Sequence, residues 1–335
     1  HNSARMTMTF DEEYRALHAA AVWADRSGCD ARIDVSGPDA TDWLQGLLTQ
    51  DMKALQPGQG AEAAYLTPQG RMIAHLVALR RAASFLLEVP ASISETVRTR
   101  LDQFVITEDV AIQDVSASLG CLTVLGPRAS ATVAQVTGLD ATTLDTLTEY
   151  AHVATEGDAA LVVATREFGV PGFDLLADPA TLAGWRAAAD AAGVREAEAG
   201  LLHTARIEAG RPRFGVDMHE DTIPLEAGLE SRAIGFDKGC YVGQEVVIRI
   251  LHRGQGRVAR RLVWVEHTPC GPERQVWEPG TEVRLGDKIV GKVGSACWSP
   301  SRGGLLCIAM VHRDAFAPGT VVTIDGLDAT VRALP

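Results

Sequence analysis

A single thiol flanked by two glycines is the feature of this sequence best suited to chemistry. Residues 237–245 read D-K-G-C-Y-V-G-Q-E, and Gly239 and Gly243 would let the backbone turn sharply or approach another group closely. Apolar residues recur at helical spacing from Gly243 onward, which predicts that Cys240 lies just ahead of a helix N-terminus. The helix dipole and the Lys238 ammonium would both favour the nucleophilic thiolate. The alternative on these residues alone is a buried structural cysteine.

Other motifs with known chemistry are incomplete. Residues 286–292, G-D-K-I-V-G-K, match the phosphate-binding loop up to its lysine, but Val293 stands where a hydroxyl should hold magnesium. A β-hairpin turning at Gly286 and Asp287 explains this run better. The nine histidines form no H-E-x-x-H motif, and the six cysteines form no C-x-x-C pair. We therefore expect neither a metal site nor a four-cysteine cluster site on this chain.

The segment around the thiol also indicates a family. Residues 238–245, K-G-C-Y-V-G-Q-E, resemble the signature of the YgfZ-type folate-binding proteins, which assist iron–sulfur cluster assembly or repair. Residues 35–40 and 44–51 resemble the G-x-D-A…L-x-x-L-x-T-x-D pattern of their superfamily, which includes the glycine-cleavage aminomethyltransferase, or T protein. R-I-E-A-G at 206–210 and I-P-L-E-A-G-L at 223–229 resemble two further runs of that superfamily.

The resemblance implies a pocket for tetrahydrofolate or one of its one-carbon derivatives. Pterin recognition needs a carboxylate that accepts paired N–H bonds, and Glu208 matches the position of the superfamily's pterin-binding glutamate. On the residues alone, Glu208 could instead pair with Arg206 or Arg211 on a helix surface.

Four more residues are candidates for the same pocket. Arg232 and Arg249 could bind the glutamate tail of folate, although either could equally be a solvated surface arginine. Tyr65 and Trp23 could flank the pterin ring, although a buried aromatic residue more often belongs to a core.

One departure from the T protein limits the chemistry that can be expected. That enzyme has a G-G-I-x-D-D-L run with a catalytic aspartate, whereas residues 70–76 here read G-R-M-I-A-H-L. Ala74 and His75 replace both acidic positions, so the negative charge that would assist the T-protein reaction is missing. We therefore list His75 as a pocket residue and do not expect the T-protein mechanism. A satisfied histidine in a buried strand is the alternative.

Three functions are consistent with these residues. The leading hypothesis is a tetrahydrofolate-binding accessory protein that supports iron–sulfur assembly proteins or client enzymes. Cys240 would be its functional thiol, and Lys238 would hold the thiolate. The alternative is a folate-dependent one-carbon transferase or demethylase that uses another acid–base group, such as His75. A folate-sensing scaffold that docks a partner through a C-terminal domain is the third, and whether the chain is an enzyme stays open.

The elements that must position these residues indicate an α+β fold. We expect an aminomethyltransferase-like folate-binding body of two intertwined parts over residues 8–255, followed by a small β-barrel over residues 256–335. Periodicity and capping residues, with Ser92 as one N-cap, predict helices over 10–22, 39–49, 92–104, 181–192 and 196–209. Apolar runs predict strands over 31–35, 72–79, 84–89 and 121–125.

The composition shifts after Gly254-Gln255-Gly256. Beyond this point short alternating runs are separated by turn signals, including the one at residues 269–272. These runs predict barrel strands over 257–266, 281–285, 289–296, 305–311 and 321–324.

Composition and charge exclude several classes of protein. The 335 residues include 43 acidic and 31 basic residues, a net charge of −12 that argues against broad nucleic-acid binding. A local basic pocket could still hold an anionic ligand. No apolar run reaches the ~18 residues of a membrane span. We find no signal-peptide pattern near the start of the sequence, and we interpret residues 1–5 as an appended remnant. Widely spread cysteines suit a reducing cytoplasm.

Overall fold

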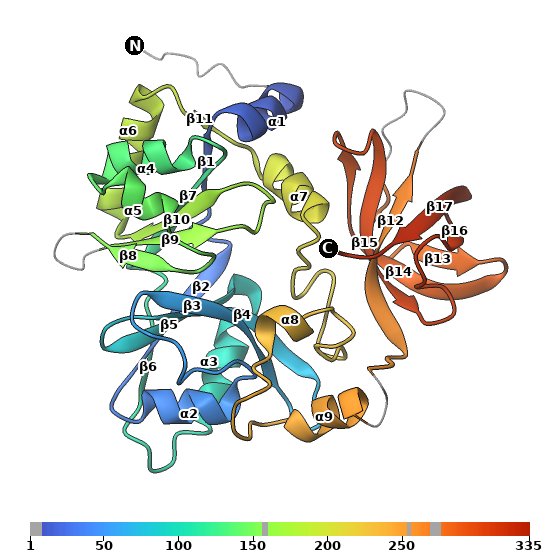
Figure 1. Cartoon of the computed structure of the whole chain (residues 1–335), viewed down its shortest axis with the longest axis horizontal. Helices are drawn as coiled ribbons and strands as arrows, with labels where there is room; N and C mark the ends of the chain where they lie inside the picture. The colour runs from blue at the N-terminus through green and yellow to red at the C-terminus, as the bar shows by residue number, and fades with distance from the viewer. Residues whose placement is uncertain (1–8, 156–159, 253–255, 269–275) are drawn as a thin grey trace. The chain divides into compact units, whose positions relative to one another are not determined.

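Two compact units make up the chain in the computed structural model (Figure 1), which describes residues 9–155, 160–252, 256–268 and 276–335. The first unit comprises residues 9–28 and 117–205, and the second comprises 29–116 and 206–335. The predicted boundary at residue 255, with Gly254, Gln255 and the turn at 269–272, lies outside the described residues. The division at that residue therefore stays a prediction.

The first unit is built on a six-stranded sheet in the order β11-β1-β7-β10-β9-β8. Its strands are β1 (Val22–Asp25), β7 (Gly120–Leu125), β8 (His152–Ala154), β9 (Leu161–Thr165), β10 (Gly172–Ala177) and β11 (Arg195–Glu196). Its helices are α1 (Phe10–Ala19), α4 (Ala129–Thr137), α5 (Ala141–Asp145), α6 (Pro179–Ala191) and the start of α7 (Ala199–Glu208). Alternate residues of β7 and β10, such as Val124 and Phe173, pack into the core with α4 and α6.

The second unit begins with a five-stranded antiparallel sheet in the order β3-β4-β5-β2-β6. Its strands are β2 (Asp30–Ser36), β3 (Gln59–Leu66), β4 (Met72–Arg80), β5 (Ser84–Pro90) and β6 (Ala111–Asp114). Two helices, α2 (Ala40–Leu47) and α3 (Ser94–Asp102), pack through Leu44 and Val97 onto residues such as Ile33 and Phe85. A 3-10 turn, η1 (Ala91–Ile93), and the helices α8 (Glu230–Ala233) and α9 (Gln244–His252) complete this part.

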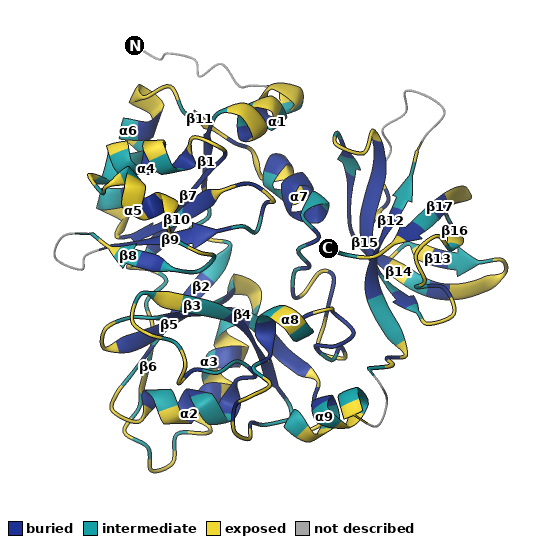
Figure 2. Cartoon of the chain, viewed as in Figure 1, coloured by how far each residue is buried: buried dark blue, intermediate teal, exposed yellow. Residues whose placement is uncertain are grey.

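A closed six-stranded barrel, in the order β12-β15-β14-β13-β16-β17, ends the second unit. Its strands are β12 (Arg260–His267), β13 (Glu282–Leu285), β14 (Lys288–Ser299), β15 (Gly304–His312), β16 (Val321–Ile324) and β17 (Leu327–Arg332). Inward-facing residues such as Val263, Cys307 and Val331 fill it. Figure 2 shows β15 largely buried, whereas β13, β16 and β17 combine buried residues with more exposed ones. The predicted α+β fold with a C-terminal barrel is confirmed.

Several element boundaries differ from the predictions. Ser92 does not cap α3, because the chain first makes the η1 turn and Ile93 takes the cap position. The helix predicted from residue 10 to 22 ends at Ala19, since Val22 already pairs with β7. β17 was not predicted, and its Leu327 pairs with β16 across a tight turn at Asp325 and Gly326.

The phosphate-loop-like run at 286–292 is a hairpin, as expected. β13 and β14 pair antiparallel across Gly286, whose φ of +58° favours glycine, and no helix follows. Among the described residues, no helix combines the length and apolar content that crossing a membrane requires.

The two glycines beside the thiol have different roles in the second unit. Gly243 has a φ of +83°, and a Cβ built there would lie 2.6 Å from the carbonyl oxygen of Thr67. It is therefore the point where the segment before α9 touches the β3–β4 turn, as the sequence suggested. At Gly239 a Cβ would meet nothing within 4 Å.

We expect Gly243→Ala to destabilise the protein by about 2 kcal/mol or more, because it adds both backbone strain and a steric clash. Gly239→Ala is the matched control and should change the free energy of unfolding by less than ~0.5 kcal/mol. Urea denaturation of both variants measures the difference. Equal effects would show that the close approach at Gly243 is not needed.

Candidate functional site

Cys240 lies in an exposed loop that leads into α9. Its position four residues before Gln244, the first residue of the helix, agrees with the prediction that it precedes a helix N-terminus. The alternative of a buried structural cysteine is wrong, because the thiol side chain is solvent-exposed.

Lys238 is buried and caps a helix. Its Nζ donates hydrogen bonds to the carbonyl oxygens of Gln45 at 2.8 Å, Leu48 at 2.6 Å and Gln50 at 2.8 Å. These carbonyls lie at the C-terminal end of α2, where a cation also opposes the helix dipole. Burial lowers the pKa of Lys238 to about 8, although the nearby Asp51 carboxylate acts in the opposite direction.

This cap corrects the expected role of Lys238. An ammonium has three hydrogens, and all of them are directed to backbone carbonyls of the α2 end. The structure therefore does not pair Lys238 with the Cys240 thiolate.

A buried carboxylate on the second unit's sheet bonds to three basic side chains. Glu62 on β3 is 3% exposed, and its Oε1 accepts from Arg211 Nη1 at 2.9 Å and from Arg232 Nη1 at 3.2 Å. Its Oε2 lies 2.9 Å from Nε2 of His75 on β4. Because Ala64 of β3 pairs with His75, the histidine and Glu62 share one face of the sheet.

The Glu62 cluster fixes the state of His75. A carboxylate between two guanidinium groups is ionised and can only accept hydrogen bonds. Nε2 of His75 must therefore carry a hydrogen, and Nδ1 can accept one only when the ring is neutral. This agrees with the alternative of a satisfied histidine in a largely buried strand, and the same carboxylate brings His75 and Arg232 together as candidates.

Tyr65 and Trp23 do not join this cluster. Three residues along β3 from Glu62, Tyr65 points to the opposite face, into the core with α2 and α3, where it is fully buried. Burial raises its pKa to about 12, and its hydroxyl has no hydrogen-bond partner. Trp23 belongs to the core of the first unit, where its Nε1 donates to Asp190. We therefore no longer place either residue against a bound ring.

Glu208, at the end of α7, is bonded to the barrel. Its Oε1 accepts from the Ser301 backbone N–H at 3.2 Å, from Ser301 Oγ at 2.6 Å and from Ser299 Oγ. Both serines lie where β14 turns toward β15. A pterin-binding role for Glu208 stays a prediction.

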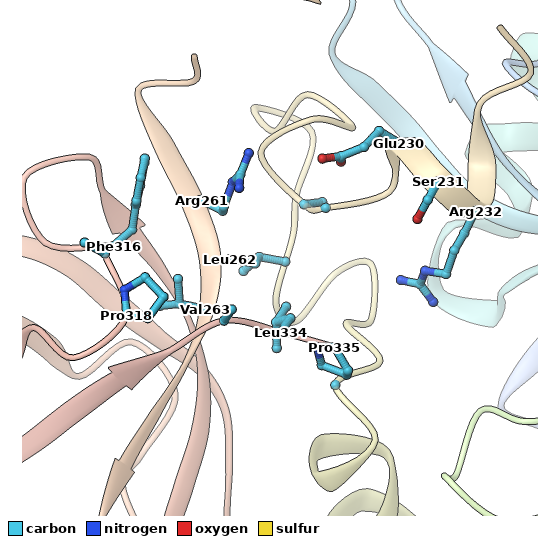
Figure 3. A pocket seen from close by; sticks show the side chains of 15 residues that line it. Glu230, Ser231, Arg232, Arg261, Leu262, Val263, Phe316, Pro318, Leu334 and Pro335 are labelled. Atoms are coloured by element: carbon cyan, nitrogen blue, oxygen red, sulfur yellow. The ribbon is translucent and has the colours of Figure 1, made fainter. Parts of the chain in front are cut away.

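A cavity of about 560 Å³ lies within the second unit, between β12 and the α8 segment (Figure 3). Glu230 and Arg232 line it from α8, and Arg261 lines it from β12. Oε2 of Glu230 and Nε of Arg261 are buried without a hydrogen-bond partner. The remaining wall is mostly apolar: Gly210, Ala227, Gly228, Ser231, Leu262, Val263, Phe316, Ala317, Pro318, Ala333, Leu334 and Pro335.

Arg232 connects this cavity to the Glu62 cluster, since the same guanidinium group bonds to Glu62. Arg249 lies exposed on α9 and does not line the cavity, so its binding role stays a prediction. Within the described ranges, no three His, Cys, Asp or Glu side chains converge as metal ligands would.

Sequence reasoning missed Glu62, Glu230 and Arg261. One signal was available, because Glu62 is the only charged residue among the apolar positions of a predictable hairpin strand. Its side chain bonds to His75 on the neighbouring strand, which the sequence did single out. No sequence pattern around Glu230 or Arg261 indicated a site, because their surroundings form only where the barrel meets α8.

Comparisons with known proteins cover nearly the whole chain. The GCVT N-terminal domain matches residues 2–238, and the glycine cleavage T-protein C-terminal barrel domain matches residues 260–335. The aminomethyltransferase of Rubrobacter xylanophilus is 31% identical over 302 residues, which cover 89% of this chain and 78% of that protein. The aminomethyltransferase of Streptomyces coelicolor is 29% identical over 317 residues, covering 92% and 83%.

A solved structure shows the same fold. The glycine cleavage system aminomethyltransferase T from Bartonella henselae superposes with a TM-score of 0.84 and 21% identity, covering 97% of this chain and 88% of that one.

We expect Lys238→Met to destabilise the protein by about 3 kcal/mol, because buried carbonyls at the end of α2 lose their donor. Lys292→Met removes an exposed lysine of the same unit and should cost less than ~0.5 kcal/mol. Chemical denaturation with a fluorescence readout compares the two. A loss no larger than that of the control would rule out the cap as a stabilising interaction.

Proposed function

The chain belongs to the glycine cleavage T-protein (GCVT) family, and on that premise we propose that it is a folate-dependent one-carbon transferase. The curated relatives that match it are aminomethyltransferases, which favours transfer chemistry over the accessory iron–sulfur role. Members of this family bind tetrahydrofolate and its one-carbon derivatives. The donor of the one-carbon unit would be an amine or sulfonium compound.

The cavity of the second unit fits such a cofactor. Its volume of about 560 Å³ lies within the range of small-molecule sites. The guanidinium groups of Arg232 and Arg261, both residues of the cavity wall, suit carboxylates and carbonyl groups. Leu262 and Phe316 offer apolar surface to a ring.

His75 is the residue that we propose for proton transfer. The observation that supports this most is its bond to the buried Glu62, which also holds Arg232 at the cavity wall. When a folate nitrogen attacks the transferred carbon, the bond from that carbon to the donor nitrogen or sulfur breaks and the donor atom leaves with the electron pair. The folate nitrogen then loses a proton, which Nδ1 of His75 would accept. The imidazolium formed would be stabilised by Glu62, which thereby supplies the negative charge that the missing aspartates would have given.

An assay with purified protein tests the reaction. It would measure one-carbon transfer to tetrahydrofolate from aminomethyl, methylamine and sulfonium donors, one donor at a time. Absence of transfer from every donor class, in protein that binds tetrahydrofolate, would count against the transferase.

With an active donor in hand, we expect His75→Gln to lower kcat about 100-fold, while the tetrahydrofolate Kd changes less than ~3-fold, because the ring acts on the proton and not on binding. His219→Gln, on an exposed loop, should leave both constants unchanged. A His75→Gln enzyme with normal kcat would remove His75 from the reaction.

A second candidate function rests on the exposure of Cys240. The Cys240 thiol is exposed in the loop before α9, within the K-G-C-Y-V-G-Q-E segment. This exposure favours a contact with iron–sulfur assembly proteins or client enzymes. The thiol would act in this role without Lys238, whose ammonium caps α2.

For this second role we expect Cys240→Ala to keep the fold and the affinity for tetrahydrofolate but to abolish rescue of iron–sulfur enzyme activity in deficient cells. Cys29→Ala should rescue like the unmodified chain. Full rescue by Cys240→Ala would exclude a role for the thiol, and one-carbon transfer in vitro should not depend on it.

A further inference from the structure

A buried threonine joins the edge of the second unit's sheet to the segment that carries Arg232. Thr49 lies just after α2 and is fully buried. Its Oγ1 accepts from the backbone N–H of Ala64 on β3 at 2.8 Å and donates to the carbonyl oxygen of Ala233 in α8 at 2.5 Å. One hydroxyl thus serves a strand and a helix at the same time, because it is both a donor and an acceptor.

The backbone of Thr49 makes the same connection. Its N–H donates to the carbonyl oxygen of Ala64 at 3.0 Å, and its carbonyl oxygen accepts from the N–H of Gly235, just after α8, at 3.0 Å. β3 is the edge strand of the five-stranded sheet, so the outward backbone groups of Ala64 depend on Thr49 for their partners. Thr49 therefore sets the spacing between β3 and the α8 segment.

The ion pair of Glu62 and Arg232 spans the same two segments. Glu62 lies two residues before Ala64 on the same face of β3, and Arg232 is the residue before Ala233. Nη1 of Arg232 lies 3.2 Å from Oε1 of Glu62, and Arg232 lines the cavity (Figure 3). The Arg232 side chain starts from the backbone that Thr49 holds, so the place of its guanidinium group at the cavity wall depends on this hydroxyl.

Gln50 adds a second bond to this backbone. Its Nε2 donates to the carbonyl oxygen of Arg232 itself at 3.1 Å. A β-branched side chain has a stiff χ1 torsion, whereas glutamine has three rotatable bonds, so Thr49 is the more rigid of the two supports.

We propose that Thr49 is a positioning residue of the cavity in the second unit, which holds the guanidinium group of Arg232 where it binds an anionic group of the cofactor. Thr49 is not among the residues that line the cavity, so it acts through Arg232. The carboxylates of tetrahydrofolate are the groups that a guanidinium ion binds most strongly. This inference rests on the proposed function, because the place of Arg232 matters only if a folate binds.

Anaerobic calorimetric titration with tetrahydrofolate tests this role. Thr49→Val keeps the shape of the side chain but removes the hydroxyl, and the Kd should rise about 10-fold because Arg232 is no longer held in one place. Thr49→Ser keeps the hydroxyl and should bind within ~3-fold of the unmodified chain.

Thr222→Val is the matched control. Thr222 is a buried threonine of the same unit, and its Oγ1 accepts from the backbone N–H of His219 at 3.0 Å. Removing this hydroxyl should lower the melting temperature but leave the Kd for tetrahydrofolate unchanged. Equal weakening of binding in Thr222→Val and Thr49→Val would mean that any loss of stability has this effect, which would overturn the proposal.

A double-mutant cycle shows whether Thr49 acts through Arg232. In an Arg232→Gln background, Thr49→Val should change the Kd less than ~2-fold, since the group that it positions is gone. The same rise in Kd in both backgrounds would contradict the proposal. Thermal melting confirms that each variant is folded. If Thr49→Val does not fold, Gln50→Met removes the other bond to this backbone and should raise the Kd about 3-fold, again only while Arg232 is present.

The outcomes distinguish this inference from the proposed function. If the unmodified chain binds tetrahydrofolate and either Thr49→Val or Arg232→Gln binds it equally well, the role of Thr49 is wrong while the folate function stands. If the unmodified chain binds no tetrahydrofolate, both are wrong.

Discussion

The buried carboxylate of Glu62 is the group that fixes Arg211, Arg232 and His75 in the second unit. A charge removed from water costs several kcal/mol unless partners replace the solvent, and here two arginines and one histidine do so. Those partners come from the strand beside Glu62, from the segment after α7 and from α8. One desolvated group thus fixes three pieces of chain, and with them the ring of His75 and the cavity wall at Arg232.

The sequence was informative where a pattern is local. Apolar periodicity and turn residues predicted α2, β2, β4, β5 and five of the six barrel strands, and the structure confirms them. Predicted element boundaries were wrong where neighbouring segments set them. At Ser92, for example, the chain makes a 3-10 turn before α3 begins. The short strands β8 and β11 have too few residues for a pattern, and pairing partners alone define them.

The site was predictable only in part, for the same reason. His75 and Arg232 could be picked out from their runs, but Arg232 meets Glu62 across 170 residues of sequence. Lys238 was predicted to act on the thiol because it lies near Cys240 in sequence, whereas its ammonium bonds to the end of α2. Residue type and spacing thus gave Lys238 the wrong partner. In the K-G-C-Y-V-G-Q-E segment, Lys238 and Gly243 therefore have structural roles, and the thiol of Cys240 is exposed.

Neither compact unit is a continuous piece of chain, and this has a consequence for synthesis on the ribosome. The first unit needs residue 22 to meet residue 125, and the second needs residue 62 to meet residues 211 and 232. Contacts so distant in sequence form late and slowly, because long loops must close before any contact is gained. The emerging sheet of the second unit would therefore leave Glu62 without its arginine partners until α8 has left the exit tunnel.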